Sequence, residues 1–462
     1  MQFGIKQLAK NSAYVLGGTV GAQLINVAVT PIITRYYTPD SFGILAIFIS
    51  IISIAIVPST LKYEFAIPTA KTEEDAGALV YISVSLLVIA AALLAMFVIV
   101  TPQTLRDLVG IEADLMTLLL FPIGLFFFGI YQILTYLYSY KERFKHIALS
   151  KFTTTGIMSI IQVMSGIFYK DVLFLIVGYI GGRIGGIFVL WERKVHLRAF
   201  SLKALKATAK RYDRFPKYVT LASLINMIGT QATPIILKTL YTIESVGLFS
   251  LSMRIMILPV QLMGQSVGQV LYSSLSKSTE NSGQTLIEIV RVLFTVCAPF
   301  FIVIFLYGDI VFAFVFGENW SDSGIFAKWL CPWLMISVIS NPLSLIAYVK
   351  NRQKTALKIT VFETALRLIA IYGGSYFGGI EWSIKLFSIA GAIISVNYII
   401  WICRISNVSI FKLLYNLRWV VLRYAIIIIL GISVSLAYPT VIIVAIVFAF
   451  DLYHTYKRIK VT

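Results

Sequence analysis

Thr30-Pro31-Ile32-Ile33, near the end of the first long apolar stretch, returns as Thr233-Pro234-Ile235-Ile236 in the second half of the chain. Each copy runs into a short polar turn that ends in Ser-x-Gly, at Ser41–Gly43 and Ser245–Gly247. Membrane carriers are often built from two structural repeats around a shared site, and paired proline-interrupted segments indicate where that site lies. The repeat therefore predicts a transporter. We expect helix kinks at the corresponding prolines of the two halves, Pro31 with Pro234 and Pro58 with Pro259.

The composition is that of a polytopic membrane protein. Of the 462 residues, 58% are hydrophobic and 13% are charged, and the mean hydropathy is +0.87. Soluble domains are nearer half apolar and a quarter charged. The apolar segments number about fourteen, and most approach the ~20 residues that a spanning helix needs. We predict an all-α membrane protein with about 14 transmembrane helices, arranged as two six-helix pseudo-symmetric bundles plus an appended pair.

The net charge of +18 follows from the distribution of basic residues around these segments. Most of the 39 lysines and arginines fall in alternate connectors, which the positive-inside rule assigns to the cytoplasm together with both termini. Lys151 and Arg291, just before the fifth and ninth segments, are counted among these connector residues. The charge therefore reflects topology, and we expect no nucleic-acid partner.

The longest basic connector, 192–217, is the natural boundary between the halves. It predicts an N-terminal bundle over 1–191 and a C-terminal bundle over 218–403, followed by appended helices and a cytoplasmic tail over 404–462. The connector itself is interpreted either as a surface helix on anionic lipid or as a linker whose charge fixes orientation.

Three arginines lie in the middle of apolar segments, where charge is costly and therefore a functional hypothesis. Arg183 sits between two glycine pairs, and Arg254 lies in the middle of a segment that has no acid after Glu244. Arg367 comes four residues after Glu363, the spacing of a local ion pair. A guanidinium can bind phosphate oxygens in a bidentate manner, and it can equally serve as a structural staple between helices.

Amide and hydroxyl side chains gather near the first proline pair. They occupy matching regions of the first and seventh segments, at Gln23, Asn26 and Thr30 and at Asn226, Thr230 and Gln231. Such groups could hydrogen-bond a polar headgroup or join neighbouring helices. The many aromatic residues of the fourth segment, Phe128 and Tyr131 among them, are interpreted mainly as lipid-facing bulk and an interfacial belt, and alternatively as rings that stack against sugars.

Motifs of soluble enzymes are absent from the sequence. It contains no Walker loop, no nucleophile elbow and no clustered metal ligands, and its three cysteines lie apart in apolar segments. We therefore expect no enzymatic activity, no cofactor and no metal, and we interpret the cysteines as small core residues.

Three short motifs resemble those of a known family. They are Lys10-Asn11-Ser12 with the glycine pair that follows, the turn Tyr37–Gly43, and Leu61–Ile67 at the end of the second segment. Together with the hydropathy and the segment count, these motifs resemble the Wzx-type O-antigen and polysaccharide flippases of the multidrug/oligosaccharidyl-lipid/polysaccharide (MOP) exporter superfamily.

The resemblance implies a protein of the bacterial inner membrane that moves an undecaprenyl-pyrophosphate-linked oligosaccharide to the periplasmic leaflet by alternating access. It implies a V-shaped pair of bundles around a basic cavity, with Arg254 best placed to hold the pyrophosphate. It also implies membrane lipids, a polysaccharide polymerase and chain-length proteins as partners. The first segment is uncharged from Ser12 to Thr34, whereas lipid II flippases carry arginine there, which disfavours lipid II as cargo.

Two other functions fit parts of the pattern. A cation-coupled drug exporter of the same superfamily would need an embedded carboxylate, and the first and seventh segments have none. A polysaccharide polymerase or ligase would be expected to carry a large periplasmic loop and no internal repeat. Drug accumulation and the leaflet in which repeat units collect would distinguish these functions.

Overall fold

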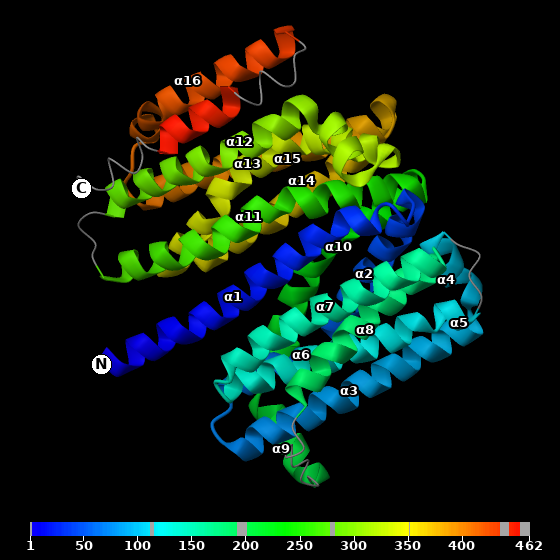
Figure 1. Ribbon diagram of the computed structural model, residues 1–462. Coiled ribbons are helices and arrows are strands. Elements are labelled where there is room, and N and C mark those ends of the chain that lie inside the picture. The colour runs from blue at the N-terminus through cyan, green and yellow to red at the C-terminus, as the bar shows by residue number, and fades with distance from the viewer. Residues whose placement is uncertain are drawn as a thin grey trace. The chain divides into compact units, whose positions relative to one another are not determined.

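The computed structural model describes residues 2–110, 115–191, 201–277, 282–350, 352–434 and 443–452, and within these ranges the ordered elements are all helices (Figure 1). The elements are α1 (Gln2–Ile33), α2 (Pro39–Ser59), η1 (Tyr63–Thr69), α3 (Glu73–Val100), α4 (Pro102–Val109), α5 (Leu115–Leu118), α6 (Leu120–Tyr140), α7 (Phe144–Phe168), α8 (Val172–Leu190), α9 (Leu202–Arg211), η2 (Phe215–Val219), α10 (Thr220–Leu240), α11 (Ile243–Lys277), α12 (Ser282–Phe316), η3 (Glu318–Trp320), α13 (Ser321–Val349), α14 (Gln353–Gly378), α15 (Ile380–Ile405) and α16 (Ile410–Val434). A short apolar helix, Ile443–Leu452, follows.

Helices long and apolar enough to cross a membrane dominate the structure. The described residues contain 11 of them, each between 19 and 31 residues long. Helix α14 falls outside that group and carries Glu363 and Arg367 near its middle. The prediction of an all-α polytopic membrane protein is confirmed.

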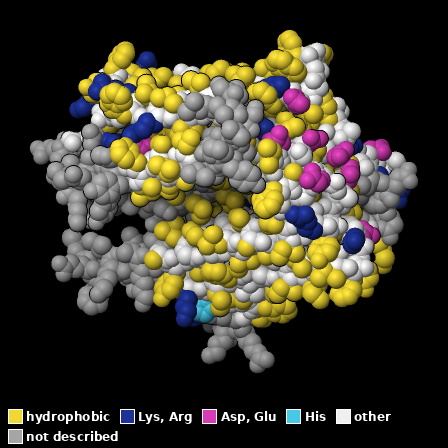
Figure 2. All heavy atoms as spheres, turned by 45° about the horizontal axis from the view of Figure 1, so that its top comes forward, with side chains coloured by type: hydrophobic (Ala, Val, Ile, Leu, Met, Phe, Trp, Pro, Cys, Tyr) yellow, Lys and Arg dark blue, Asp and Glu magenta, His cyan; other side chains and the backbone are white. Residues whose placement is uncertain are grey.

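The exposed side chains of these helices are the kind that lipid covers. Hydrophobic side chains spread over much of the visible surface in Figure 2. On α3 they form a long row: Val88, Ile89, Leu93, Met96, Phe97 and Val100. Apolar surface on this scale would be a liability in water, whereas helices with satisfied backbones carry it readily in a bilayer.

The chain forms two compact units, Met1–Gly247 and Leu248–Thr462. The first unit contains α1 to α10 and the first residues of α11, and within it α10 packs along α2. The repeat boundary over 192–217, and the bundle ranges on either side of it, stay predictions drawn from sequence symmetry.

The repeated Ser-x-Gly turns begin two helices in the same way and touch each other. Thr38 caps α2 by accepting a hydrogen bond from the Ser41 amide at 3.5 Å, and Thr242 accepts one from the Ser245 amide at 3.2 Å. A Cβ on Gly43 would collide with the Ile243 carbonyl oxygen, and a Cβ on Gly247 would collide with that of Pro39. The glycines of both copies are therefore required for this backbone contact.

Replacing Gly247 with leucine is expected to lower the midpoint of thermal denaturation of the purified protein. The added side chain must push apart two backbones already in contact, and such overpacking costs about 1–3 kcal/mol. Gly156→Leu in α7 is the control, because an added Cβ there meets nothing within 4 Å. Equal midpoints for the two variants would contradict the contact.

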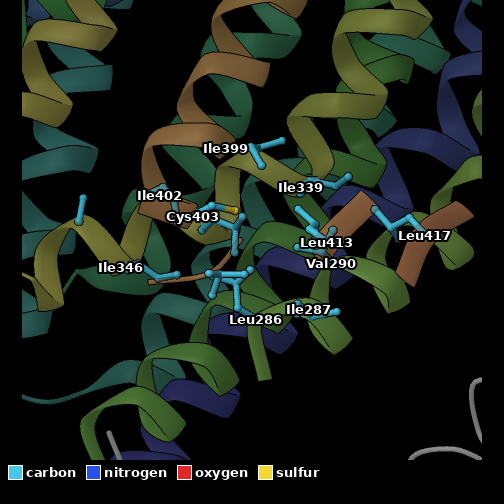
Figure 3. Packing of buried hydrophobic residues seen from close by; sticks show 13 residues of the cluster. Leu286, Ile287, Val290, Ile339, Ile346, Ile399, Ile402, Cys403, Leu413 and Leu417 are labelled. Carbon is cyan, nitrogen blue, oxygen red and sulfur yellow. The ribbon is translucent and has the colours of Figure 1, made fainter. Parts of the chain in front are cut away.

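The core of the second unit joins four helices. Leu286, Ile287 and Val290 of α12 meet residues of α13, α15 and α16, as Figure 3 shows. Cys403 of α15 lies in this cluster, and all three cysteines, Cys297, Cys331 and Cys403, are free and buried. Their interpretation as small core residues is confirmed. Arg291, next to Val290, is 8% exposed inside α12 and within the candidate span Leu286–Phe316, so its assignment to a connector is wrong.

Candidate functional site

Arg183 is presented by a helix that its glycines bring close to a neighbour. Helix α8 packs along α7, and a Cβ on Gly182 would lie 2.5 Å from the Thr154 carbonyl oxygen. Gly185 and Gly186 likewise meet side chains of Ile157 and Thr154. The glycine pairs thus serve helix packing, as one interpretation of the sequence held.

The Arg183 guanidinium lies in an aromatic cage formed by Phe128 and Tyr131 of α6 and Tyr179 of α8. Its carbon is 4.4 Å from the centroid of the Phe128 ring, 5.0 Å from that of Tyr131 and 5.6 Å from that of Tyr179. Cation–π contacts with a desolvated arginine are worth up to about 2 kcal/mol. Within the described ranges, no carboxylate forms an ion pair with Arg183. The rings hold the cation without neutralising it.

The cage changes the interpretation of the fourth segment. Phe128 and Tyr131 belong to the aromatic run assigned mainly to lipid contact, yet both face Arg183. The Tyr131 hydroxyl also lies 3.3 Å from Ser150 Oγ on α7. Residues of α6, α7 and α8 thus meet around one cation.

A second cation of the first unit escaped the sequence analysis. Lys151 lies about two turns inside α7, within a candidate membrane span, and not in the connector to which it was assigned. Its Nζ donates a hydrogen bond to Thr19 Oγ1 of α1 at 2.7 Å. The available signal was the start of helix periodicity at Phe144, earlier than the apolar composition alone indicates.

In the second unit, Arg254 lies half-buried in α11, within the candidate span Ile243–Gly264. Two residues before Arg254, the Ser252 hydroxyl lies within hydrogen-bond distance of two carbonyl oxygens, 2.8 Å from that of Leu248 in its own helix and 2.6 Å from that of Ser323 in α13. Helix α11 is therefore fixed to α13 close to Arg254. The role of Arg254 in binding stays a prediction.

Arg367 has the local partner that its spacing predicts. Its Nη2 is 3.6 Å from Glu363 Oε1, and its guanidinium carbon lies 4.8 Å from the Trp333 ring and 5.5 Å from the Phe387 ring. The ion pair from the sequence analysis is confirmed. A cation already paired and stacked in this way has less capacity left for a substrate anion.

The predicted amides differ in their surroundings. Gln231 of α10 accepts a hydrogen bond from Ser50 Oγ of α2 at 3.4 Å, so it joins two helices. Asn226 is exposed on α10, whereas Gln23 and Asn26 are half-buried on α1. The four predicted kink prolines, Pro31, Pro58, Pro234 and Pro259, all lie inside helices.

Another buried charge cluster lies where the Leu61–Ile67 motif begins. Lys62 Nζ is 3.3 Å from Glu64 Oε1, and both side chains are almost fully buried. Gln132 of α6 donates to the same carboxylate oxygen at 3.3 Å. Leu61 and Lys62 both have positive φ, so the backbone turns here in a strained conformation. The buried ion pair and its hydrogen bond hold this turn in place. The motif was visible in the sequence, but its internal ion pair was not.

Comparison with known proteins decides the family. Residues 32–324, well over half of the chain, match the family described as Polysaccharide biosynthesis protein. The chain belongs to this family. Its matched range includes Lys151, Arg183 and Arg254, and it ends before Glu363 and Arg367.

Individual relatives agree with the family. The chain is 22% identical over 169 residues to the lipopolysaccharide biosynthesis protein WzxC of Escherichia coli (strain K12), a match to 36% of this chain and 34% of that protein. The match thus spans about a third of the curated relative's length.

Solved structures show the fold. The lipid II flippase MurJ in an inward closed conformation aligns with a TM-score of 0.78 at 14% identity, covering 96% of this chain and 98% of MurJ. An inward-facing multidrug resistance MATE family transporter of the MOP superfamily aligns with a TM-score of 0.62 at 13% identity, covering 85% and 98%. This polysaccharide biosynthesis family member therefore shares the fold of these two solved transporters.

Proposed function

We propose that the protein is a flippase that translocates an undecaprenyl-pyrophosphate-linked oligosaccharide, the repeat unit of an O-antigen, capsule or exopolysaccharide, across the bacterial inner membrane by alternating access. In this proposal the unit is taken up on the cytoplasmic side and released to a polymerase and chain-length proteins on the periplasmic side. Family membership and the MOP fold support the transport of a lipid-linked saccharide.

The observation that carries the proposal is that Arg183 lies within a candidate membrane span, is held by aromatic rings and forms no ion pair with a described carboxylate. An intramembrane cation that no described carboxylate neutralises needs some other compensation. The aromatic cage supplies part of it and also fixes the plane of the guanidinium. A planar, oriented guanidinium matches two oxygens of a phosphate group, which is the charged part of a lipid pyrophosphate.

A cation-coupled drug exporter fits the charges of the described residues less well. Such a carrier needs an embedded carboxylate that can exchange its cation. Two carboxylates of the described helices are already held by basic partners: Glu363 by Arg367 at 3.6 Å and Asp309 by Lys328 at 2.6 Å. Exchange at either residue would first have to break a formed ion pair.

Deleting the gene in its bacterium tests the proposal. We expect lipid-linked repeat units to accumulate in the cytoplasmic leaflet, inaccessible to a membrane-impermeant glycosidase added to spheroplasts. Loss of a polymerase would instead leave single units accessible outside. Accessible units, or normal surface polysaccharide with increased accumulation of cationic dyes, would refute the flippase and favour the polymerase or the drug exporter respectively.

The proposed orientation places both termini in the cytoplasm. Reporters inserted in the turns at Glu142 and Ser406 are expected to show cytoplasmic location, and those at Lys170 and Gly379 periplasmic location. Paired alkaline phosphatase and green fluorescent protein fusions measure this directly. A periplasmic signal at Glu142 would invert the first half.

A further inference from the structure

Lys151 is a cation placed at the contact of α1 and α7, and it has no role in the site described so far. Its position about two turns into α7 corresponds to roughly 10 Å along the helix axis. Close helix packing makes the contact possible, because a Cβ on Gly18 of α1 would lie 2.6 Å from Ala148 Cα. The glycines of α1 therefore bring Lys151 within reach of the opposite helix.

Hydrogen-bond directions show how the ammonium group is held. The Thr19 hydroxyl donates its own proton to the Val15 carbonyl oxygen at 2.8 Å, so it faces Lys151 as an acceptor. An ammonium group has three donors, and Thr19 accepts one of them. Within the described residues Lys151 has no acidic partner. Two of its donors remain for a further acceptor.

The acceptor would approach along a polar face of α1. Thr19 is the first of four polar residues at helical spacing on one side of this helix, Thr19, Gln23, Asn26 and Thr30. The Thr30 hydroxyl is turned back to the Asn26 carbonyl oxygen at 2.6 Å. From Ser12 onward, helix α1 supplies neutral polar groups only, and Lys151 supplies the positive charge from α7.

We propose that Lys151 binds a phosphate group of the lipid-linked substrate, with Thr19 fixing the position of the ammonium. This inference rests on the proposed function and adds a binding residue to it. The ligand class is a polyprenyl phosphate or diphosphate, which the ammonium contacts as a point charge at the end of the polar face of α1. Arg183 contacts the same class of anion from α8 in the same unit.

The test measures the binding of three lipids to the full-length protein in detergent. Undecaprenyl pyrophosphate is the charged probe, undecaprenol has the same tail without phosphate, and phosphatidylglycerol is an ordinary anionic lipid. Lys151→Met should weaken undecaprenyl pyrophosphate binding by about tenfold or more, the effect of one charge-assisted hydrogen bond, and leave undecaprenol binding unchanged. Lys151→Arg should retain most of the affinity.

Lys145→Met is the matched control, because Lys145 lies in the first turn of the same helix and is exposed. It should bind all three lipids like the original protein. Thr19→Val removes the acceptor without removing the charge, and we expect it to lose affinity for the pyrophosphate lipid by less than Lys151→Met. If Lys151→Met does not fold, Lys151→Gln and Thr19→Val provide the same comparison.

The possible outcomes separate this inference from the function. Suppose that the original protein binds undecaprenyl pyrophosphate. If Lys151→Met binds this lipid equally well, or if its affinity for undecaprenol falls by the same factor, the residue is structural. The inference about Lys151 then fails, while the proposed function stands. If phosphatidylglycerol competes as well as the pyrophosphate lipid, Lys151 belongs to a general lipid contact and the inference also fails. If the original protein does not distinguish undecaprenyl pyrophosphate from undecaprenol, the proposed function fails with it.

Discussion

Replacing Arg254 with alanine is expected to abolish surface polysaccharide while the protein stays inserted and at normal abundance. Arg254 is a half-buried cation within a candidate membrane span of α11. A guanidinium within a span can bind two oxygens of a pyrophosphate group, so its loss should remove this contact with the substrate. Arg254→Lys should restore part of the export, because it keeps the charge and loses the planar pair of donors.

The measurement compares exported polysaccharide with the amount of membrane-inserted protein. Lys203→Ala on α9 is a suitable control, since it removes one positive charge from an exposed position. Normal export by Arg254→Ala would show that the residue takes no part in transport. Degradation of both Arg254→Ala and Arg254→Lys would show that it holds the fold together.

The class of fold could be predicted because it depends on properties that can be read along the chain, namely the length of apolar segments and their repetition. Apolar length predicts spanning helices, and the repeated Thr-Pro-Ile-Ile stretch predicts two related halves. The paired Ser-x-Gly turns were also visible, whereas the helix caps by Thr38 and Thr242 and the direct contact through Gly43 and Gly247 were not. A contact between residues far apart in sequence has no signature in composition or periodicity.

The candidate site was predictable only where it depends on local sequence. Arg183 and Arg367 were recognised because a charge within an apolar run is conspicuous, and the Glu363 ion pair follows from helical spacing. Lys151 and Arg291 were missed because the helices begin before the apolar run does, so each was assigned to a connector. The direction in which a mid-helix side chain points also depends on tertiary packing, and Phe128 was therefore taken for lipid-facing bulk.

Replacing Arg183 is expected to have an effect of similar size, and the aromatic cage makes its test more specific. Arg183→Ala should reduce export by about tenfold or more, because one oriented, charge-assisted contact with phosphate is lost. Arg183→Lys should rescue less than the corresponding change at Arg254, because Phe128 and Tyr131 stack on a planar guanidinium and a compact ammonium cannot replace it.

Two further variants distinguish binding from packing at Arg183. Arg183→Met keeps an extended side chain against the three rings, so it should preserve thermal stability and still fail to export. Phe128→Leu removes the ring nearest to the guanidinium, at 4.4 Å, and should weaken export while Arg183 remains present. Export by Arg183→Met at the level of the original protein would mean that the cage needs only a side chain of suitable size. The oriented cation would then have no part in binding the pyrophosphate, and the observation on which the proposed function rests would be lost.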